Sequence, residues 1–222
     1  MESKRMAGEK ACEAVQDGMI VGLGTGSTVF YTIEKLGELV QAGLQIKGVA
    51  TSIETEELAK KWHIPLLSFN EVTEIDVTID GADEVTRDFA GIKGGGGALL
   101  REKLVALISK RNIWVVDESK VVEVLGKFCL PVEVLPFSYK YVERALKKQN
   151  IGANVRYAQD GEVFLTNNGN MILDLEIYPL LDAKKLANEL DSLSGIVEHG
   201  LFLGIADELI IGKNDGTVEM LS

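Results

Sequence analysis

The first half of the chain alternates short apolar runs with stretches of helical periodicity. Runs rich in aliphatic and β-branched residues end at glycine or aspartate, which is typical of buried strands that lead into turns. Between them, apolar residues recur at spacings of three and four, which indicates amphipathic helices. Strands are predicted over residues 19–21, 46–51, 75–79 and 112–116, and helices over 2–16, 29–40, 53–62 and 98–110. This alternation predicts an α/β fold with a Rossmann-like parallel sheet flanked by helices.

The pattern changes from Leu130 onward. Strands are predicted at 131–135, 153–158, 171–176 and 195–199, helices at 139–149 and 182–193, and an extra hairpin arm at 163–165. This βαββαβ order predicts an inserted smaller α+β domain of the ferredoxin-like kind. Two last strands, 208–211 and 217–221, flank Asn214-Asp215-Gly216 as a hairpin that returns to the main sheet. We therefore expect an α/β domain of residues 1–129 and 204–222 and a small domain of residues 130–203.

Composition narrows the possible functions. The formal net charge of -11 argues against nucleic-acid binding, which depends on Lys and Arg neutralising phosphates. No apolar run is long enough to span a bilayer and no signal-peptide pattern is found, so we expect no membrane association and a cytoplasmic location. Cys12 and Cys129 are expected to be buried free thiols, and His63 and His199 structural histidines. A zinc site or a histidine-centred triad is therefore not expected.

Candidate catalytic groups gather in the stretch DGADEVTRDFAGIKGGGGALLREK, which we expect to be one loop and the start of a helix. Asp80 and Asp83 follow a predicted strand, at the carboxyl end where open α/β sheets bind ligands. Lys93 precedes Gly94–Gly97, whose amides can approach a ligand closely because no Cβ intervenes. Glu102 falls in the first turn of the helix. Each feature alone is typical of a turn or a helix start, but together they indicate an active site in the larger domain, which we expect to be the catalytic one.

A second glycine-containing loop, GLGTGST, occupies Gly22–Thr28 between the first predicted strand and the next helix. Its amides and the hydroxyls of Thr25, Ser27 and Thr28 can form an anion site at the positive end of that helix. The loop is not a Walker A motif, and Ser27 replaces the third glycine of a dinucleotide fingerprint. A monophosphate is the better match, although a plain strand-to-helix turn has a similar composition. Lys120, after a later strand, either points into the same crevice or is a solvated loop lysine.

Several motifs in a fixed order make the chain resemble the A type of ribose-5-phosphate isomerase over essentially its whole length. These motifs are GLGTGST at 22–28, DGADE at 80–84, KGGGGALLREK at 93–103, DESK at 117–120, LPVEVLP at 130–136 and TNNGNMILD at 166–174. Two departures are slight. Glu118 stands where the family commonly has alanine, and Gly97 stands where alanine is frequent. Neither removes a group that the chemistry needs.

The resemblance implies an aldose-ketose isomerase that interconverts D-ribose 5-phosphate and D-ribulose 5-phosphate through an enediolate, in the pentose phosphate pathway. It implies no metal or organic cofactor, and a homodimer or homotetramer. Glu102 would be the base that moves a proton between C2 and C1, and Lys93 would stabilise the enediolate oxygen. Asp80 would help to open the furanose ring, and Asp83 would complete the catalytic set. The residues implied to contact the substrate are Thr25, Gly26, Ser27, Thr28, Asp80, Gly81, Ala82, Asp83, Lys93, Gly94, Gly95, Gly96 and Lys120.

The residue chemistry agrees with this reading independently. An aldose-ketose shift needs a carboxylate that reaches two carbons, a cation near the developing oxyanion and a phosphate-binding group. A hydride-shift isomerase would need metal ligands, of which the sequence has no evident set. The main alternative is a non-catalytic sugar-phosphate sensor of the same architecture, which usually carries a DNA-binding helix-turn-helix for which we expect no room. A coenzyme A transferase and an amino-sugar phosphate deaminase with a related sheet are further alternatives.

Overall fold

The computed structural model describes every residue from Met1 to Ser222. The residues form two compact units. The first comprises Met1–Ala82, Arg101–Val121 and Gly204–Ser222, and the second comprises Asp83–Leu100 and Val122–Leu203. The chain therefore passes from the second unit back to the first within the opening turn of helix α4 (Leu99–Leu107).

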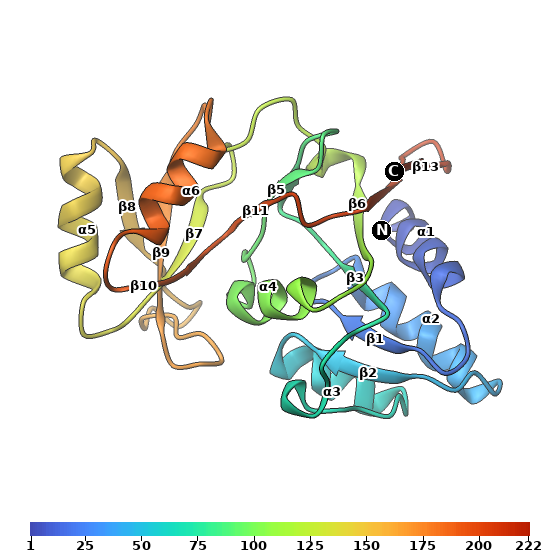
Figure 1. The fold of residues 1–222 in the computed structure, drawn as a ribbon. Helices are drawn as coiled ribbons and strands as arrows, with labels where there is room; N and C mark the ends of the chain where they lie inside the picture. The colour runs from blue at the N-terminus through green and yellow to red at the C-terminus, as the bar shows by residue number, and fades with distance from the viewer. The chain divides into compact units, whose positions relative to one another are not determined.

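The first unit is built on a six-stranded sheet (Figure 1). From one edge to the other its strands are β13 (Val218–Leu221), β12 (Glu208–Gly212), β6 (Asn112–Asp117), β3 (Val77–Asp80), β1 (Ile20–Leu23) and β2 (Lys47–Ala50). All neighbours are parallel except β13, which pairs antiparallel with β12. The predicted α/β class is confirmed, and the predicted terminal hairpin does return to the main sheet.

Helices cover both faces of this sheet. One face is covered by α1 (Glu2–Ala11), α2 (Val29–Gln41) and α3 (Ile53–Lys61), which share an apolar core with the strands. Val21 and Leu23 of β1 point into that core. Ile20 points to the opposite face, where Val105 of α4 contributes to a second apolar cluster. Successive strand residues face opposite sides of a sheet, so β1 supplies both layers.

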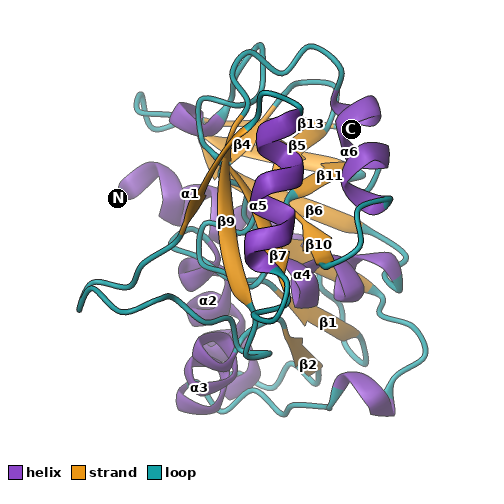
Figure 2. Cartoon of the chain, turned by 90° about the vertical axis from the view of Figure 1, so that its left-hand side faces the viewer, coloured by secondary structure: helices purple, strands orange, loops and turns teal.

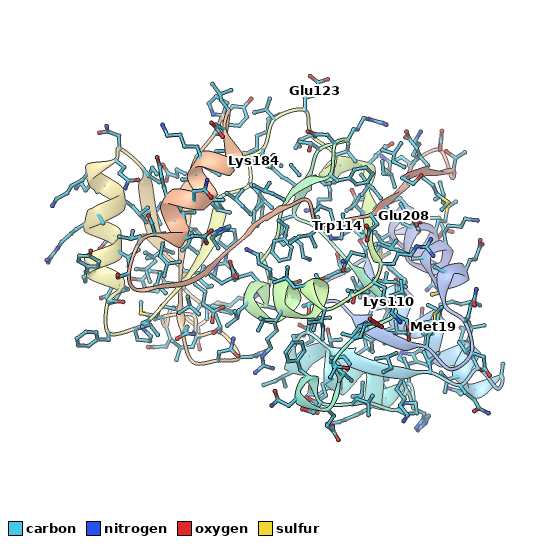
Figure 3. The ribbon with its side chains drawn as sticks, in the orientation of Figure 1. Met19, Lys110, Trp114, Glu123, Lys184 and Glu208 are labelled. Atoms are coloured by element: carbon cyan, nitrogen blue, oxygen red, sulfur yellow. The ribbon has the colours of Figure 1, made fainter.

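Polar contacts join β6 to β12 where the two strands begin. Arg111 Nε donates to Glu208 Oε1 at 2.6 Å, and the Asn112 amide donates to Asp207 Oδ2 at 2.7 Å. Farther along β6, Trp114, which is labelled in Figure 3, is only 2% exposed. These contacts lie where β6 and β12 begin, at the opposite end of the strands from their carboxyl ends.

The second unit contains a four-stranded antiparallel sheet with strand order β10-β7-β9-β8. Its two helices are drawn in purple in Figure 2. In chain order the elements are β7 (Leu130–Val134), α5 (Tyr139–Lys148), β8 (Gly152–Val155), β9 (Met171–Glu176), α6 (Ala183–Asp191) and β10 (Ile196–His199). The predicted βαββαβ order is therefore confirmed. Leu146 of α5 and Leu190 of α6 pack with Val132 of β7 in one core. Since strand residues alternate, the other face of this sheet carries Glu133 and Asp174.

A small three-stranded sheet in the second unit was not predicted. Its order is β11 (Leu201–Leu203), β5 (Ala90–Ile92) and β4 (Glu84–Val85), with antiparallel pairing throughout. The prediction of a plain loop over this stretch was therefore wrong. Strands of two and three residues are too short to show alternation, and β5 gains its second partner only when the chain returns at β11. Phe89 adopts φ 64° in the tight turn between β4 and β5.

Other predicted elements differ at their ends. The first helix ends at Ala11 and continues as a 3-10 turn, Cys12–Ala14. Helix α4 ends at Leu107, because the following backbone pairs with Ile75: the Lys110 amide donates to the Ile75 carbonyl at 2.9 Å. The expected arm at 163–165 makes only isolated bridges and no strand. None of the helices has the length and apolar character needed to cross a membrane.

Residues 83–100 and 122–129 belong to the second compact unit. The division into a catalytic domain of residues 1–129 and 204–222 and a small domain of residues 130–203 stays a prediction.

Candidate active site

Three strands of the first unit end at the same sheet edge. β1, β3 and β6 are parallel neighbours, and their carboxyl ends lead into residues 24–28, 80–82 and 118–120. Open α/β sheets bind ligands outside the carboxyl ends of their strands. The structure thus places eight predicted site residues along one edge: Thr25, Gly26, Ser27, Thr28, Asp80, Gly81, Ala82 and Lys120.

Asp80 is tied to the loop that follows β1. Asp80 is only 3% exposed, and its Oδ1 accepts hydrogen bonds from the amides of Thr25 at 3.1 Å and Gly81 at 2.8 Å. Gly24 has no space for a side chain, because a Cβ there would stand 2.1 Å from Asp80 Oδ1. The glycine therefore allows the loop to lie directly on the carboxylate.

The hydroxyl of Thr25 holds the same loop to the start of α3. Thr25 Oγ1 donates to Ser52 Oγ at 2.9 Å, and it lies 2.8 Å from Thr51 Oγ1 and 3.2 Å from Thr55 Oγ1. Thr55 in turn donates to the Gly24 carbonyl at 2.8 Å. This network directs the Thr25 hydroxyl into the protein. Of the other loop hydroxyls, Ser27 is exposed and Thr28 is buried at the N-cap of α2.

Lys4 joins this loop, although the sequence did not single it out. Its Nζ donates to Ser27 Oγ at 2.8 Å and lies 3.8 Å from Asp117 Oδ2. The lysine is brought there because α1 packs against α2. No local sequence signal reports this, since the contact spans 23 positions. A positive charge beside the N-terminus of α2 favours negatively charged groups there, in a protein of net charge -11.

Lys120 ends the 3-10 turn Glu118–Lys120 that follows β6. The Asp117 side chain caps this turn by accepting the Ser119 amide at 3.0 Å. Lys120 itself is half-buried, which is less exposed than a fully solvated loop lysine. The turn thus places a second ammonium group at the carboxyl ends of the strands, where the loop of residues 24–28 also lies.

Glu102 lies in the first turn of α4 and is only 4% exposed. A carboxylate near a helix N-terminus is favoured by the backbone dipole. Removing a carboxylate from water is nevertheless costly, and an acid kept in such a position is a candidate for proton transfer.

The second unit holds the remaining predicted residues. Lys93 follows β5 and is 2% exposed, and its Nζ lies 5.4 Å from the centre of the Phe202 ring. Asp83 Oδ2 accepts the amide of Gly95 at 2.7 Å, and the Asp83 amide donates to the Ile92 carbonyl at 2.8 Å. The unit therefore brings together Asp83, Lys93, Gly94, Gly95 and Gly96. The chain links them to the first unit through the bonds between residues 82 and 83 and between residues 100 and 101.

The second unit also contains a cluster that could be taken for a metal site. Candidate ligand atoms of Asp191, Glu198 and His199 lie within 4.8 Å of one another. However, His199 Nδ1 accepts the Leu201 amide at 3.2 Å, so a neutral imidazole carries its proton on Nε2. That Nε2 faces Asp191 Oδ1 at 3.2 Å. A donor N–H is not a metal ligand, so the contacts of His199 fit a structural histidine.

The cysteines are free, as predicted. Burial raises the pKa of the Cys12 thiol to about 12, and the thiol donates to the Gly8 carbonyl at 3.4 Å. Cys129 is only partly buried, so the prediction of full burial was wrong for it; burial also raises its pKa. Raised thiol pKa values disfavour the thiolate, so neither cysteine has the character of a nucleophile.

The fold, the phosphate-type loop and the buried acid and lysine are together features of α/β enzymes that act on small phosphorylated substrates. Residues 47–216 match the profile of the family described as ribose 5-phosphate isomerase A (phosphoriboisomerase A). The chain belongs to the ribose 5-phosphate isomerase A family, as its sequence motifs predicted. The comparisons give no support to the non-catalytic sensor.

Individual relatives match this chain along its whole length. Ribose-5-phosphate isomerase A of Listeria monocytogenes is 59% identical over 221 residues, covering 100% of this chain and 99% of the relative. The solved structure of ribose 5-phosphate isomerase from Plasmodium falciparum is similar with a TM-score of 0.95 and 38% identity, covering 100% of this chain and 99% of that one. A D-ribose-5-phosphate isomerase solved in complex with phospho-erythronic acid gives a TM-score of 0.95 at 37% identity, covering 100% and 98%.

Proposed function

We propose that the chain interconverts D-ribose 5-phosphate and D-ribulose 5-phosphate, a step of the pentose phosphate pathway. The observation that carries the proposal is the buried carboxyl of Glu102 at the start of α4, in a chain of the ribose 5-phosphate isomerase A family. A positioned carboxylate that reaches two neighbouring carbons in turn is what an aldose-ketose shift requires.

In the proposed reaction Asp80 first assists the opening of the furanose ring to the free aldehyde. The Glu102 carboxylate then takes the proton from C2, the C–H electron pair forms the C1–C2 double bond, and O1 becomes an oxyanion. The ammonium group of Lys93 stabilises this enediolate. A proton passes from the C2 hydroxyl to O1, and Glu102 returns its proton to C1, which leaves a ketone at C2. Asp83 holds the glycine run beside Lys93 by accepting the Gly95 amide.

The remaining predicted residues are proposed to bind the substrate. The N-terminus of α2, the Ser27 hydroxyl and Lys4 supply amide, hydroxyl and ammonium donors, and such donors suit a phosphate group. Lys120 adds a second cation at the same sheet edge. The ligand of one relative, phospho-erythronic acid, is a four-carbon acid phosphate. The further contacts are proposed for Thr25, Gly26, Thr28, Asp80, Gly81, Ala82, Asp83, Lys93, Gly94, Gly95 and Gly96.

The chemistry proposed needs a base, a cation and amide donors, all of which the side chains and backbone can supply, so we propose that no metal or organic cofactor takes part. We further propose a cytoplasmic enzyme that forms a homodimer or homotetramer. Residues 1–129 and 204–222 would form the catalytic domain, and residues 130–203 the small domain.

One experiment tests the reaction directly. The purified protein, treated exhaustively with a chelator, is incubated with ribose 5-phosphate in deuterated water. The expected product is ribulose 5-phosphate with solvent deuterium at C1, because the proton carried by Glu102 exchanges with solvent. Binding without turnover would support the sensor instead. Turnover lost on chelation and restored by a divalent cation would contradict the metal-free mechanism, and complete retention of protium at C1 would argue for a hydride shift.

A further inference from the structure

Arg156, which follows β8, contacts the backbone of the glycine run in the same unit. Its Nη1 donates to the carbonyl oxygens of Gly94 and Gly95, each at 2.9 Å. The contacts span 62 and 61 positions of sequence, and the arginine side chain is only 14% exposed. One guanidinium nitrogen thus binds two consecutive carbonyls of the loop that carries the proposed oxyanion-stabilising groups.

The guanidinium is itself held from two sides. Asp174 of β9 accepts from Arg156 Nε at 2.9 Å, and its second oxygen accepts from Nη2, so the pair is bidentate. The Phe164 ring lies 5.8 Å from the guanidinium carbon. The same ring fills the space beside Gly97, where a Cβ would stand 2.5 Å from two of its atoms and where φ is 77°. Bidentate pairing and the cation–π contact with the ring leave the guanidinium little freedom.

The geometry of the peptide unit determines the direction of the N–H groups that follow these two carbonyls. In a trans peptide the carbonyl and the following N–H point in opposite directions. The carbonyl of Gly94 faces Arg156, and the N–H of Gly95 faces the other way, onto Asp83 Oδ2 at 2.7 Å. By the same rule, the Gly95 carbonyl on Arg156 directs the N–H of Gly96 away from the guanidinium. Gly96 is the most exposed glycine of the run.

We propose that Arg156 is a positioning residue that aims the Gly96 amide at the oxyanion of the bound substrate, an inference that rests on the proposed isomerase function. Arg156 does not contact the substrate in this proposal; it acts through the two peptide units. Its positive charge at the carbonyl end also polarises both peptides, which makes their N–H groups stronger donors. Preorganised amide donors act where charge develops in the transition state.

The test uses Arg156→Gln and Asp174→Asn, with Arg144→Gln, an exposed arginine on α5, as the matched control. For Arg156→Gln we expect kcat to fall by roughly 10- to 100-fold with KM within about threefold, since a misaimed donor costs mainly transition-state stabilisation. Asp174→Asn should give a smaller loss, because the arginine remains but loses half of its anchor. Phospho-erythronic acid, whose carboxylate resembles the enediolate, should bind more weakly to Arg156→Gln, whereas inhibition by inorganic phosphate should not change.

Amide hydrogen exchange provides a readout that does not depend on activity. In Arg156→Gln the peptide covering residues 93–98 should exchange faster, while the peptide covering residues 22–28 should not change. Normal kcat, or unchanged exchange in residues 93–98, would overturn the proposal, as would an equal loss of phosphate inhibition, which would indicate general damage. If the unaltered protein does not isomerise ribose 5-phosphate at all, the proposed function fails instead, and the exchange result alone decides whether Arg156 orders the loop.

Discussion

The ammonium group of Lys4 donates a 2.8 Å hydrogen bond to the hydroxyl of Ser27. This contact joins the first turn of α1 to the loop before α2, and it places a cation at the positive end of a helix. Such an arrangement is suited to an anion that brings two negative charges, as a phosphate monoester does.

Lys4→Gln should therefore weaken binding of the phosphorylated substrate. We expect KM for ribose 5-phosphate to rise by roughly 5- to 20-fold, the effect of one charge-assisted contact, with kcat within about twofold. Steady-state kinetics at low salt will measure this. Lys10→Gln is the matched control, since Lys10 lies on the same helix and pairs only with the exposed Glu13. A fall in kcat at unchanged KM would show that Lys4 acts elsewhere.

Glu102→Gln should abolish most turnover without abolishing binding. Removing the base should lower kcat by roughly 10²- to 10⁴-fold, because the amide cannot accept the C2 proton. The amide has nearly the same shape as the acid, so phospho-erythronic acid should still bind within a few fold. Calorimetry and thermal melting will separate lost chemistry from lost folding. Near-normal turnover would remove Glu102 from the role of base.

Gly24→Ala should disturb the loop through sterics alone. The added methyl group would stand 2.1 Å from Asp80 Oδ1 and 2.6 Å from its Cα. Overpacking of this kind should lower the free energy of unfolding by about 1–3 kcal/mol. Gly81→Ala is the matched control, because a Cβ there meets its nearest atom at 3.7 Å. Urea unfolding compares the two, and equal stability would show that the loop can move off the carboxylate.

The raised pKa of Cys12, about 12 because the thiol is buried, predicts a pH dependence of stability. Above the ordinary thiol value of 9.0 the unfolded chain loses the proton, whereas the folded chain keeps it. The contribution of this thiol to the free energy of unfolding is therefore fully present below pH 9. It is lost as the pH rises from 9 toward 12, by up to about 1.4 kcal/mol per pH unit. Unfolding free energies of the protein and of Cys12→Ala, measured from pH 8 to 10.5, should converge. Parallel curves would contradict the prediction.

The parts of the fold that the sequence predicted are those with strong local patterns. Buried strands such as β6 are recognisable as short apolar runs, and amphipathic helices such as α2 by their helical periodicity. The βαββαβ order of the second unit was predicted from patterns of the same kind. The three-stranded sheet could not be predicted in this way, because β4 and β5 are too short and β5 pairs with β11, distant in sequence.

The candidate site residues also fall into two groups, those in local sequence motifs and those brought to the site by tertiary contacts. Asp80, Lys93 and Glu102 lie in motifs that are contiguous in sequence, so the linear pattern was enough to propose them as site residues. Lys4 and Arg156 could not be identified in this way, because nothing beside them in sequence distinguishes them from the other lysines and arginines of the chain. Their partners, Ser27 and the Gly94 carbonyl, are found only after helices pack and sheets pair.

By itself the sequence determined the α/β class, the family and the short motifs that hold the acids, the lysine and the glycines. These depend on interactions between near neighbours, which a linear pattern records. Only the tertiary structure decided which carbonyls the Arg156 guanidinium holds, which hydroxyls anchor Thr25 and which cation stands beside Ser27. Those contacts join residues far apart in the chain, and they form only because burial of the apolar faces brings the elements together.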